Sequence, residues 1–286
     1  MLLASQVGLF EGGIAVVWRL RRRVTRLVQG WLIENHGMAK HFIRNKYVAY
    51  PFAGGRIFLN ARESSMMLAR VFGLYEPEKM KAVRTLLKPG GIFIDIGGNK
   101  GDFALLAASK VGDSGKVLCI EPEPRNCYWI QESIKLNGCG NIKLFDLALS
   151  DHEGKASLYL GQMSGFHTLL GAIHGRNAGV ITVRTETLDG LLAELHQGRV
   201  DMIKIDVEGA ELSVLKGAQQ TLSQNRKLTL LIDLHPSLGV DVAQVRDFLS
   251  GLGFSMYYMK APFDVSIQAG DCPSELMAYR SRPDEV

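Results

Sequence analysis

The sequence predicts an α/β protein with a doubly wound, mainly parallel sheet that carries helices on both faces. Three observations support this prediction. Apolar runs typical of buried strands alternate with segments of helical periodicity, 31 glycines stand against nine prolines, and apolar residues make up 47% of the 286 residues. Glycine suits the tight turns between strands and helices, and the apolar content supplies a large core. The same composition excludes a disordered or fibrous protein.

The basic charge of the chain belongs to its first segment. Residues 1–50 contribute about +6 to a net charge of +4, so the remainder is slightly acidic. Apolar residues recur there at steps of three and four, with arginines between them, which predicts a basic amphipathic helix. Two interpretations stay open: the helix packs on the main domain, or it docks on an anionic membrane or a partner. Leu2–Leu20 is too polar for a membrane span.

A hairpin is predicted next, over Tyr47–Asn60, around Ala53-Gly54-Gly55. Residues 1–60 are therefore expected to form an N-terminal appendage of helix and hairpin, and residues 61–286 the main domain. Helices are predicted from Glu76 to Leu87 and at Phe103–Lys110, Arg125–Leu136, Leu188–His196, Ala210–Ser223 and Val242–Gly251. Strands are predicted at Ile92–Ile96, Val117–Ile120, Ile142–Leu149, Met202–Asp206, Leu228–Leu234, Phe254–Met259 and Leu276–Arg280. Between them, Ser157–Leu160 and Val180–Val183 form an extended pair around a glycine-spaced loop.

The turn after the strand Ile92–Ile96 is the most informative stretch. Gly97 and Gly98 allow the backbone to approach a ligand closely, and Gly101 lets the next helix begin against the strand. Asp95 precedes the first glycine, where it would repel a pyrophosphate but could hold an ammonium group directly or through water. The turn therefore differs from a dinucleotide fingerprint.

A second acid ends the next strand. Glu121 lies twenty residues past Gly101, where a carboxylate is placed to accept hydrogen bonds from both ribose hydroxyls. A cofactor with an amino group and a ribose but no phosphate fits S-adenosylmethionine. The alternative is that these acids only cap turns.

Several blocks after about Tyr47 resemble the FkbM-like S-adenosylmethionine-dependent methyltransferases. They are Arg56-Ile57-Phe58, Leu74-Tyr75-Glu76-Pro77-Glu78, Phe93 to Gly101, Glu121-Pro122, Ala148-Leu149-Ser150-Asp151 and, most specifically, Lys204-Ile205-Asp206-Val207-Glu208-Gly209-Ala210-Glu211. The resemblance implies a Rossmann-like class I methyltransferase fold and O-methylation of a hydroxyl on a small molecule or sugar.

The resemblance also implies roles for individual residues. Asp95, Gly97, Asn99 and Gly101 would line the methionine portion of the cofactor, with Gly98 where the family usually has Ala. Glu121 would hold the ribose, and Asp146 and Leu147 would lie near the adenine edge.

Matched spacings on two predicted strands indicate the acceptor side of the site. Lys204 and Asp206 lie on one face of their strand because side chains alternate. Asp233 and His235 have the same spacing at the end of the next strand. We expect Lys204 to pair with Asp233. Asp206 is then expected to project beside His235 at the carboxyl edge.

His235 is the predicted general base, because an imidazole with a pKa of ~6.5 accepts a proton at neutral pH. Asp206 is expected to position the substrate or the amino group of the cofactor. Glu208 and Glu211 either have a functional role or only complement the helix dipole. His235 could instead form a structural hydrogen bond at the end of its strand. Asp206, Glu208 and His235 offer mixed oxygen and nitrogen ligands, but no repeated metal-ligand spacing supports a cation site, so no metal is predicted.

The loop Gly161–Gly179 is long enough to close over the acceptor. His167 and Arg176 are its predicted substrate-contacting residues, with His167 as a second candidate base. An ordinary surface loop is the alternative.

The leading prediction is a cytoplasmic O-methyltransferase, membrane-peripheral if the basic helix docks, whose partner is a small-molecule or glycan hydroxyl. A reducing compartment fits the four cysteines, which show no paired spacing. A nicotinamide-dependent oxidoreductase would share the glycine turn and the ribose acid, but Asp95 counts against it. An RNA or protein methyltransferase and a non-catalytic adapter are further alternatives. Nucleic acid is not expected as a partner, because the main domain lacks a positive field and an Asn/Asp-Pro-Pro-Tyr segment.

Overall fold

The computed structural model describes residues 47–53, 55–60, 69–70, 73–161, 167–169, 177–260, 263, 265–268 and 270–280. The predicted basic helix lies outside the described residues, so its membrane or partner contact stays a prediction, as does the division at residue 60. The chain divides into two compact units, one of Met1–Val48 with Leu59–Tyr75 and one of Ala49–Phe58 with Glu76–Val286. Among the described residues, no helix is both long enough and apolar enough to cross a bilayer.

The second unit is built on a seven-stranded sheet with the strand order β11-β12-β10-β9-β3-β4-β5. Its strands are β3 (Ile92–Ile96), β4 (Lys116–Ile120), β5 (Ile142–Phe145), β9 (Met202–Ile205), β10 (Thr229–Asp233), β11 (Ser255–Tyr258) and β12 (Glu275–Tyr279). Neighbouring strands from β5 to β10 run parallel, and β12 runs antiparallel to both β10 and β11. The predicted mainly parallel sheet is confirmed.

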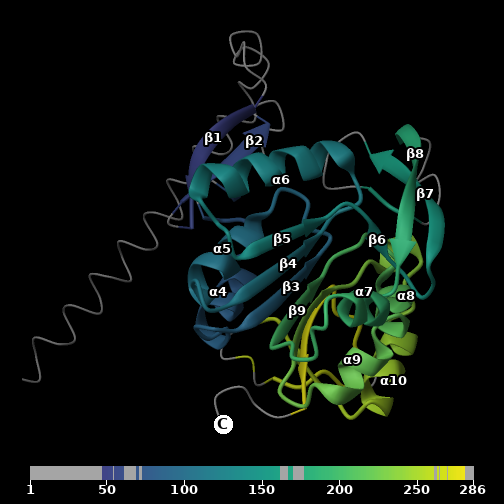
Figure 1. Cartoon of the computed structure of the whole chain (residues 1–286). Coiled ribbons are helices and arrows are strands. Elements are labelled where there is room, and N and C mark those ends of the chain that lie inside the picture. The colour runs from purple at the N-terminus through teal and green to yellow at the C-terminus, as the bar shows by residue number, and fades with distance from the viewer. Residues whose placement is uncertain are drawn as a thin grey trace, which may run out of the picture. The chain divides into compact units, whose positions relative to one another are not determined.

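Helices cover both faces of this sheet (Figure 1). On one face lie α4 (Pro77–Leu86), α5 (Asp102–Val111) and α6 (Pro124–Asn137). On the other lie α7 (Leu188–Glu194), α8 (Glu211–Lys216), α9 (Gln219–Gln224) and α10 (Val242–Gly251). The doubly wound arrangement follows from the alternation of strands and helices along the chain, since parallel strands need crossover connections.

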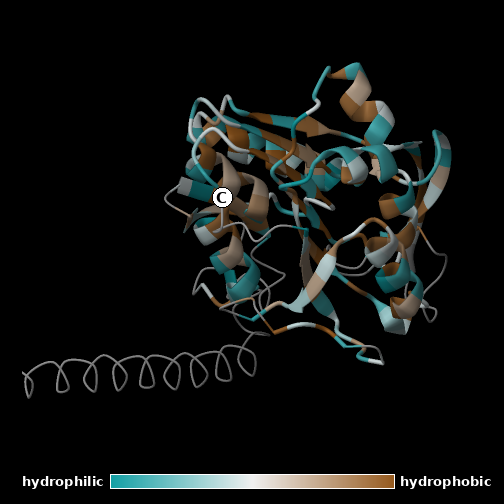
Figure 2. Ribbon diagram, turned by 90° about the horizontal axis from the view of Figure 1, so that it is seen from below, coloured by the Kyte–Doolittle hydropathy of each residue, from teal (hydrophilic) through white to brown (hydrophobic). Residues whose placement is uncertain are grey.

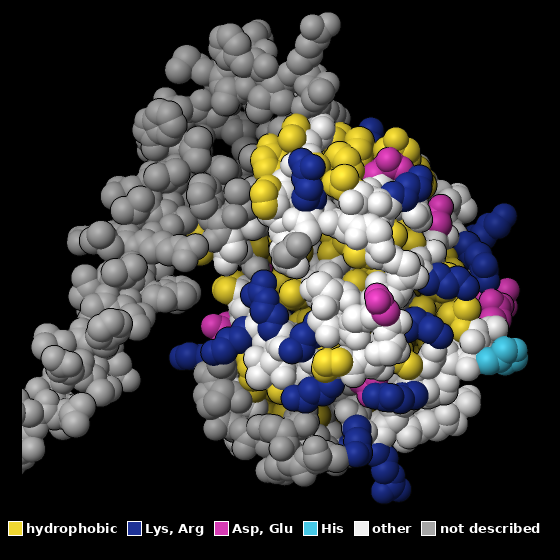
Figure 3. Space-filling model, turned by 60° about the vertical axis from the view of Figure 1, so that its left-hand side comes forward, with side chains coloured by type: hydrophobic (Ala, Val, Ile, Leu, Met, Phe, Trp, Pro, Cys, Tyr) yellow, Lys and Arg dark blue, Asp and Glu magenta, His cyan; other side chains and the backbone are white. Residues whose placement is uncertain are grey.

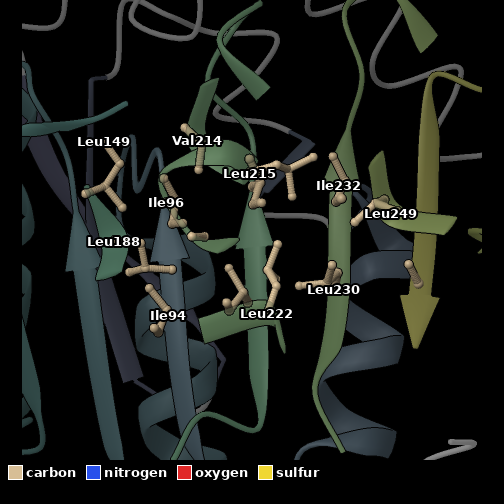
Figure 4. Close-up of a cluster of buried hydrophobic side chains, with 14 of the residues drawn as sticks. Ile94, Ile96, Leu149, Leu188, Val214, Leu215, Leu222, Leu230, Ile232 and Leu249 are labelled. Atoms are coloured by element: carbon tan, nitrogen blue, oxygen red, sulfur yellow. The ribbon is translucent and has the colours of Figure 1, made fainter. Parts of the chain in front are cut away.

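Alternate strand residues form the core beneath α7 to α10. Ile94, Ile96 and Leu230 are at most 1% exposed and pack in one cluster with Leu188 and Val214 of the covering helices (Figure 4). Figure 2 shows the same distribution, with hydrophobic residues along several central strands. In Figure 3, lysine and arginine side chains of the described residues lie dispersed on the visible face among uncharged and acidic ones.

Two smaller sheets accompany the main one. The predicted hairpin is confirmed as β1 (Tyr47–Phe52) and β2 (Gly55–Asn60). The second small sheet has the order β6-β8-β7 and contains β6 (Ala148–Leu149), β7 (Gly154–Gly161) and β8 (Asn177–Glu186). The predicted extended pair is confirmed by the antiparallel pairing of β7 with β8.

Two predicted elements are interrupted. The strand predicted over Ile142–Leu149 ends at Phe145, and the chain then joins another sheet as β6. The single helix predicted over Ala210–Ser223 is instead α8 and α9, which break around Gly217. A Cβ on Gly217 would lie 2.0 Å from Ser150 O, so the chain passes too close to its neighbour for any side chain. Asp189 then caps α9 by accepting hydrogen bonds from the backbone of Gln220 and Thr221.

Candidate active site

A cavity lies at the carboxyl ends of β3, β4 and β9, where strand order reverses and α/β proteins bind their ligands. It is lined by Ile96, Gly97, Asn99, Ile120, Glu121, Pro122, Asn126, Ala148, Leu149, Leu158, His167, Leu169, Asp206, Val207 and Glu208. Its volume is about 60 Å³, below the several hundred Å³ of a typical ligand pocket.

The glycine turn forms one wall because its backbone passes very close to two other strands. A Cβ on Gly97 would lie 1.9 Å from Asp206 O, and Gly97 has a φ of +78°. A Cβ on Gly98 would lie 2.5 Å from Cys119 Sγ of β4, so a side chain at this position would collide with the cysteine. The backbone N–H groups of Gly97 and Gly98 both donate to Ile120 O, at 3.0 and 2.9 Å. These contacts fix the turn beside the cavity.

Glu121 and Asn99 hold each other in place at the end of β4. The Asn99 N–H donates to Glu121 Oε2 at 2.7 Å, and the Asn126 side chain donates to Oε1 at 3.2 Å. Burial raises the pKa of Glu121 to about 7, although three hydrogen bonds oppose the shift. Asn99 Oδ1 is buried without a hydrogen-bond partner while its residue lines the cavity. An unpaired buried acceptor is costly unless a ligand supplies the donor.

Asp95 is fully buried, which differs from the predicted contact with a ligand. Its carboxylate lies beneath the turn, and it is not among the lining residues. Oδ1 lies 3.5 Å from Lys204 Nζ, because Asp95 and Lys204 are register partners on β3 and β9. Burial raises the pKa of Asp95 to about 6, and Lys204 opposes this shift. Lys204 also donates to Gly97 O at 3.0 Å, so the pair supports the turn from below.

Asp146 and Leu147 are not among the residues that line the cavity, and their predicted place near the adenine edge of the cofactor stays a prediction. Leu147 is 4% exposed within the hydrophobic core, and Asp146 is exposed with Oδ1 3.8 Å from Cys127 Sγ. Because β5 ends at Phe145 and the chain changes sheets, Ala148 and Leu149 line the cavity instead.

The predicted pairing of Lys204 with Asp233 is wrong, because the strand register differs by two residues. Lys204 lies opposite Leu231, not Asp233. Asp233 forms an ion pair with Lys79 of α4, whose side chain is 2% exposed and also pairs with Glu76. Burial raises the pKa of Asp233 to about 7, Asp206 adds to the rise, and Lys79 opposes it.

A cluster of three acids surrounds His235 on the opposite side of the cavity from Glu121. His235 Nδ1 donates to Glu211 Oε1 at 2.7 Å. Its Nε2 lies 3.4 Å from Glu208 Oε2 and 3.8 Å from Asp206 Oδ1. The structure therefore brings together the three residues predicted as catalytic, although His235 itself does not line the cavity. Glu208 has a φ of +50°, in the left-handed region, which costs about 1–2 kcal/mol for a residue with a Cβ.

The environment of His235 does not suit a base that acts at neutral pH. Burial alone would lower its pKa, but the hydrogen bond to Glu211 and the charge of Glu208 raise it to about 9. His235 therefore lacks the ordinary imidazole pKa from which a base at neutral pH was predicted. Burial raises the pKa of Glu208 to about 7, and the positive charge of His235 opposes this rise.

His167 lines the cavity, and its Nδ1 accepts a hydrogen bond from the Gly161 N–H at 3.1 Å. The next residue, Thr168, donates from Oγ1 to Glu208 O at 2.6 Å, so this segment contacts the acid cluster. Arg176 lies outside the described residues. The predicted contacts of His167 and Arg176 with a substrate stay predictions.

Sequence reasoning missed three contributors to this site. Asn126 is one of them, although it lies in the first turn of the predicted helix that follows Glu121, which was a signal that it could contact this acid. The apolar wall of Leu149 and Leu158 comes from β6 and β7, two strands of the small sheet that are not neighbours, and it left no local signal. The hydrogen bond between Glu211 and His235 was also missed, because it joins the start of α8 to the end of β10.

A protein-family model matches a segment that includes every residue named above as lining the cavity. Residues 95–256, more than half of the chain, match the Methyltransferase FkbM domain. The chain belongs to the FkbM methyltransferase family. The predicted family is confirmed.

Curated relatives of this FkbM methyltransferase are also methyltransferases. The 2-O-methyltransferase NoeI of Sinorhizobium fredii is 29% identical over 158 residues, which cover 50% of this chain and 64% of NoeI. Methyltransferase 1 of Beauveria bassiana is 27% identical over 185 residues, which cover 57% of this chain and 72% of the relative. The crystal structure of Methyltransferase FkbM from Methylobacillus flagellatus aligns with a TM-score of 0.44 at 15% identity, over 73% of this chain and 54% of that one. The chain thus spans less than two thirds of NoeI and of the crystallised protein.

Proposed function

We propose that this FkbM methyltransferase uses S-adenosylmethionine to methylate a hydroxyl of a small molecule or sugar. The observation that carries the proposal is the pairing of Glu121 with Asn99 on one side of a cavity whose other side is acidic. The similarity to a 2-O-methyltransferase supports oxygen as the accepting atom.

The residues on the β3 and β4 side fit this cofactor. Asn99 Oδ1 is an unpartnered acceptor that suits an ammonium group or a hydroxyl. Glu121 is fixed by backbone and side-chain donors, and its carboxylate suits the two ribose hydroxyls. Leu149 and Leu158 supply an apolar wall for the base. Asp95 contributes indirectly, by holding Lys204 under the turn.

The cofactor supplies a methyl group on a sulfonium, which a hydroxyl oxygen can accept after it loses its proton. Alignment of the two reacting groups is the main task of the protein in such a displacement. Asp206 and Glu208 line the cavity on the side away from Glu121, so we place the acceptor hydroxyl against these carboxylates. His235 lies behind them and holds their arrangement. All three residues predicted as catalytic thus keep a role, but the two carboxylates, and not His235, contact the hydroxyl.

A nicotinamide-dependent oxidoreductase is less well supported. Tyr75 and Lys79 have the Tyr-x-x-x-Lys spacing of one dehydrogenase class, a match that is visible in the sequence. Lys79 is 2% exposed, however, and its ammonium group is held by Glu76 and Asp233. Its ammonium group is therefore committed to structural ion pairs.

Binding of S-adenosylhomocysteine and of NADH to the purified chain distinguishes the two functions. Isothermal titration should show one saturable site for S-adenosylhomocysteine and none for NADH. Transfer of labelled methyl from S-adenosylmethionine to a panel of polyhydroxylated acceptors then tests the reaction, with mass spectrometry to locate the methyl on oxygen. Binding of NADH without binding of S-adenosylhomocysteine, or a product methylated on nitrogen or carbon, contradicts the proposal.

A further inference from the structure

We propose that Asp206, Glu208 and His235 form a binding site for one divalent cation. Asp206 and Glu208 follow β9, and His235 follows β10, so two neighbouring strand ends bring the three side chains together. One ligand atom from each residue lies within 4.8 Å of the other two. The closest pairs are His235 Nε2 with Glu208 Oε2 at 3.4 Å and with Asp206 Oδ1 at 3.8 Å.

These separations suit ligands of a common ion. A cation held at about 2.1 Å by nitrogen and oxygen places its ligands about 3.0 Å apart at right angles and about 4.2 Å apart across the ion. The two measured distances fall between these limits. The three side chains can therefore hold one ion with small adjustments.

His235 is oriented as metal-binding histidines usually are. Its Nδ1 donates to Glu211 Oε1 at 2.7 Å, which directs Nε2 at the two other carboxylates, where a bound cation would take the place of the Nε2 proton. A hydrogen bond from the second ring nitrogen to a carboxylate is the common support of a metal-bound imidazole. Glu211 is 0% exposed, so this support is fixed within the core.

An independent observation indicates that positive charge is missing here. Glu211 Oε2 is buried beside the cluster without a hydrogen-bond partner. Lys204, 3.4 Å from Asp206, also pairs with Asp95, and Lys79 pairs with Asp233. Within the described part of the chain, the ion pairs of Glu208 and Glu211 run only to His235. A divalent cation would balance this excess of carboxylates.

The donor set limits the choice of cation. Two carboxylates and one imidazole suit Mn²⁺, Fe²⁺ or Zn²⁺ better than Ca²⁺, which prefers oxygen ligands alone. Asp206 and Glu208 face the cavity, so coordination positions remain open on that side. If the proposed function holds, an acceptor hydroxyl bound there would lose its proton at a lower pH. Cation binding itself does not depend on that function.

Mn²⁺ is the probe for this site. After treatment with EDTA and its removal, titration followed by electron paramagnetic resonance should show one saturable Mn²⁺ site per chain. Asp206→Asn, Glu208→Gln and His235→Ala should each weaken binding at least tenfold, and Glu211→Gln about tenfold to a hundredfold. Glu132→Gln is the matched control, because the ion pair of Glu132 within the described residues is with Lys135, on the surface of α6. Its affinity should equal that of the unaltered chain.

Circular dichroism establishes that each variant is folded before its affinity is compared. Should Glu211→Gln not fold, Glu208→Gln and His235→Ala carry the test, since both side chains are partly exposed. A folded chain that binds no Mn²⁺ at millimolar concentration overturns the proposal, as does equal affinity in Glu208→Gln and Glu132→Gln. Titration without S-adenosylmethionine tests only the cation site. Binding of S-adenosylhomocysteine in EDTA tests the cofactor side separately, so the two proposals can fail independently.

Discussion

Replacement of Glu121 by glutamine should weaken cofactor binding and remove most of its pH dependence. Burial raises the pKa of Glu121 to about 7, so half of the molecules carry a neutral carboxyl at that pH. Ribose hydroxyls donate hydrogen bonds to the ionised form, and binding therefore releases a proton below pH 7. Affinity is expected to rise with pH.

The size of the effect follows from this pKa. The ionised fraction rises from about 0.1 at pH 6 to about 0.9 at pH 8, so the Kd for S-adenosylhomocysteine should fall about tenfold over this range. A hydrogen bond to a charged acceptor contributes about 2 kcal/mol, so Glu121→Gln should raise the Kd at pH 8 about thirtyfold. The glutamine also presents an N–H group where the Asn99 N–H needs an acceptor.

Isothermal titration at pH 6, 7 and 8 checks both numbers. Glu123→Gln is the matched control, because Glu123 caps α6 two residues away by accepting from Arg125 and Asn126. This control should keep the tenfold dependence, with a slightly lower midpoint, since the charge of Glu123 contributes to the raised pKa of Glu121. A Kd that is equal at pH 6 and pH 8 in the unaltered chain, or a dependence that survives in Glu121→Gln, refutes the reasoning.

Three further outcomes are expected. The stability contribution of Glu121, about 3 kcal/mol at most, is present below its ordinary pKa of 4.5 and is lost as the pH rises through about 7, so thermal melts of Glu121→Gln should depend less on pH in this range. Gly97→Ala should abolish S-adenosylhomocysteine binding and lower the Tm, because its Cβ would collide with Asp206 O, whereas Gly140→Ala has open space and should change neither. Lys204→Met should lower the free energy of unfolding, measured in urea, by about 3–5 kcal/mol, because it leaves Asp95 buried and unpaired. If the double variant with Asp95→Asn recovers none of this free energy, the ion pair contributes less than its geometry implies.

The sequence predicted those parts of the fold whose signals are local. Apolar runs marked the strands of the main sheet, most clearly the central parallel strands, which are buried on both faces. Glycine and proline marked most helix ends, as at Pro124 and Gly138 of α6. The break at Gly217 was missed, because its cause is a contact with Ser150, far away in the sequence.

The candidate site was predictable to the extent that it follows from strand ends. Glu121, Asp206 and Glu208 line the cavity because parallel strands bring their carboxyl ends to one edge. Offsets between strands were not predictable, since loop lengths and packing set the register. The register between β9 and β10 differs by two residues from the predicted one. Asp233 therefore pairs with Lys79, and Lys204 pairs with Asp95. The pKa of His235 likewise depends on Glu211, which a different element supplies.

Lys204 joins the two halves of the cavity, and this has a consequence for redesign. One ammonium group supports Gly97 O under the cofactor turn and also contacts Asp206 on the acceptor side. If the proposed function holds, substitutions of Asp206 that aim at another acceptor would thus also disturb the turn that binds the methyl donor.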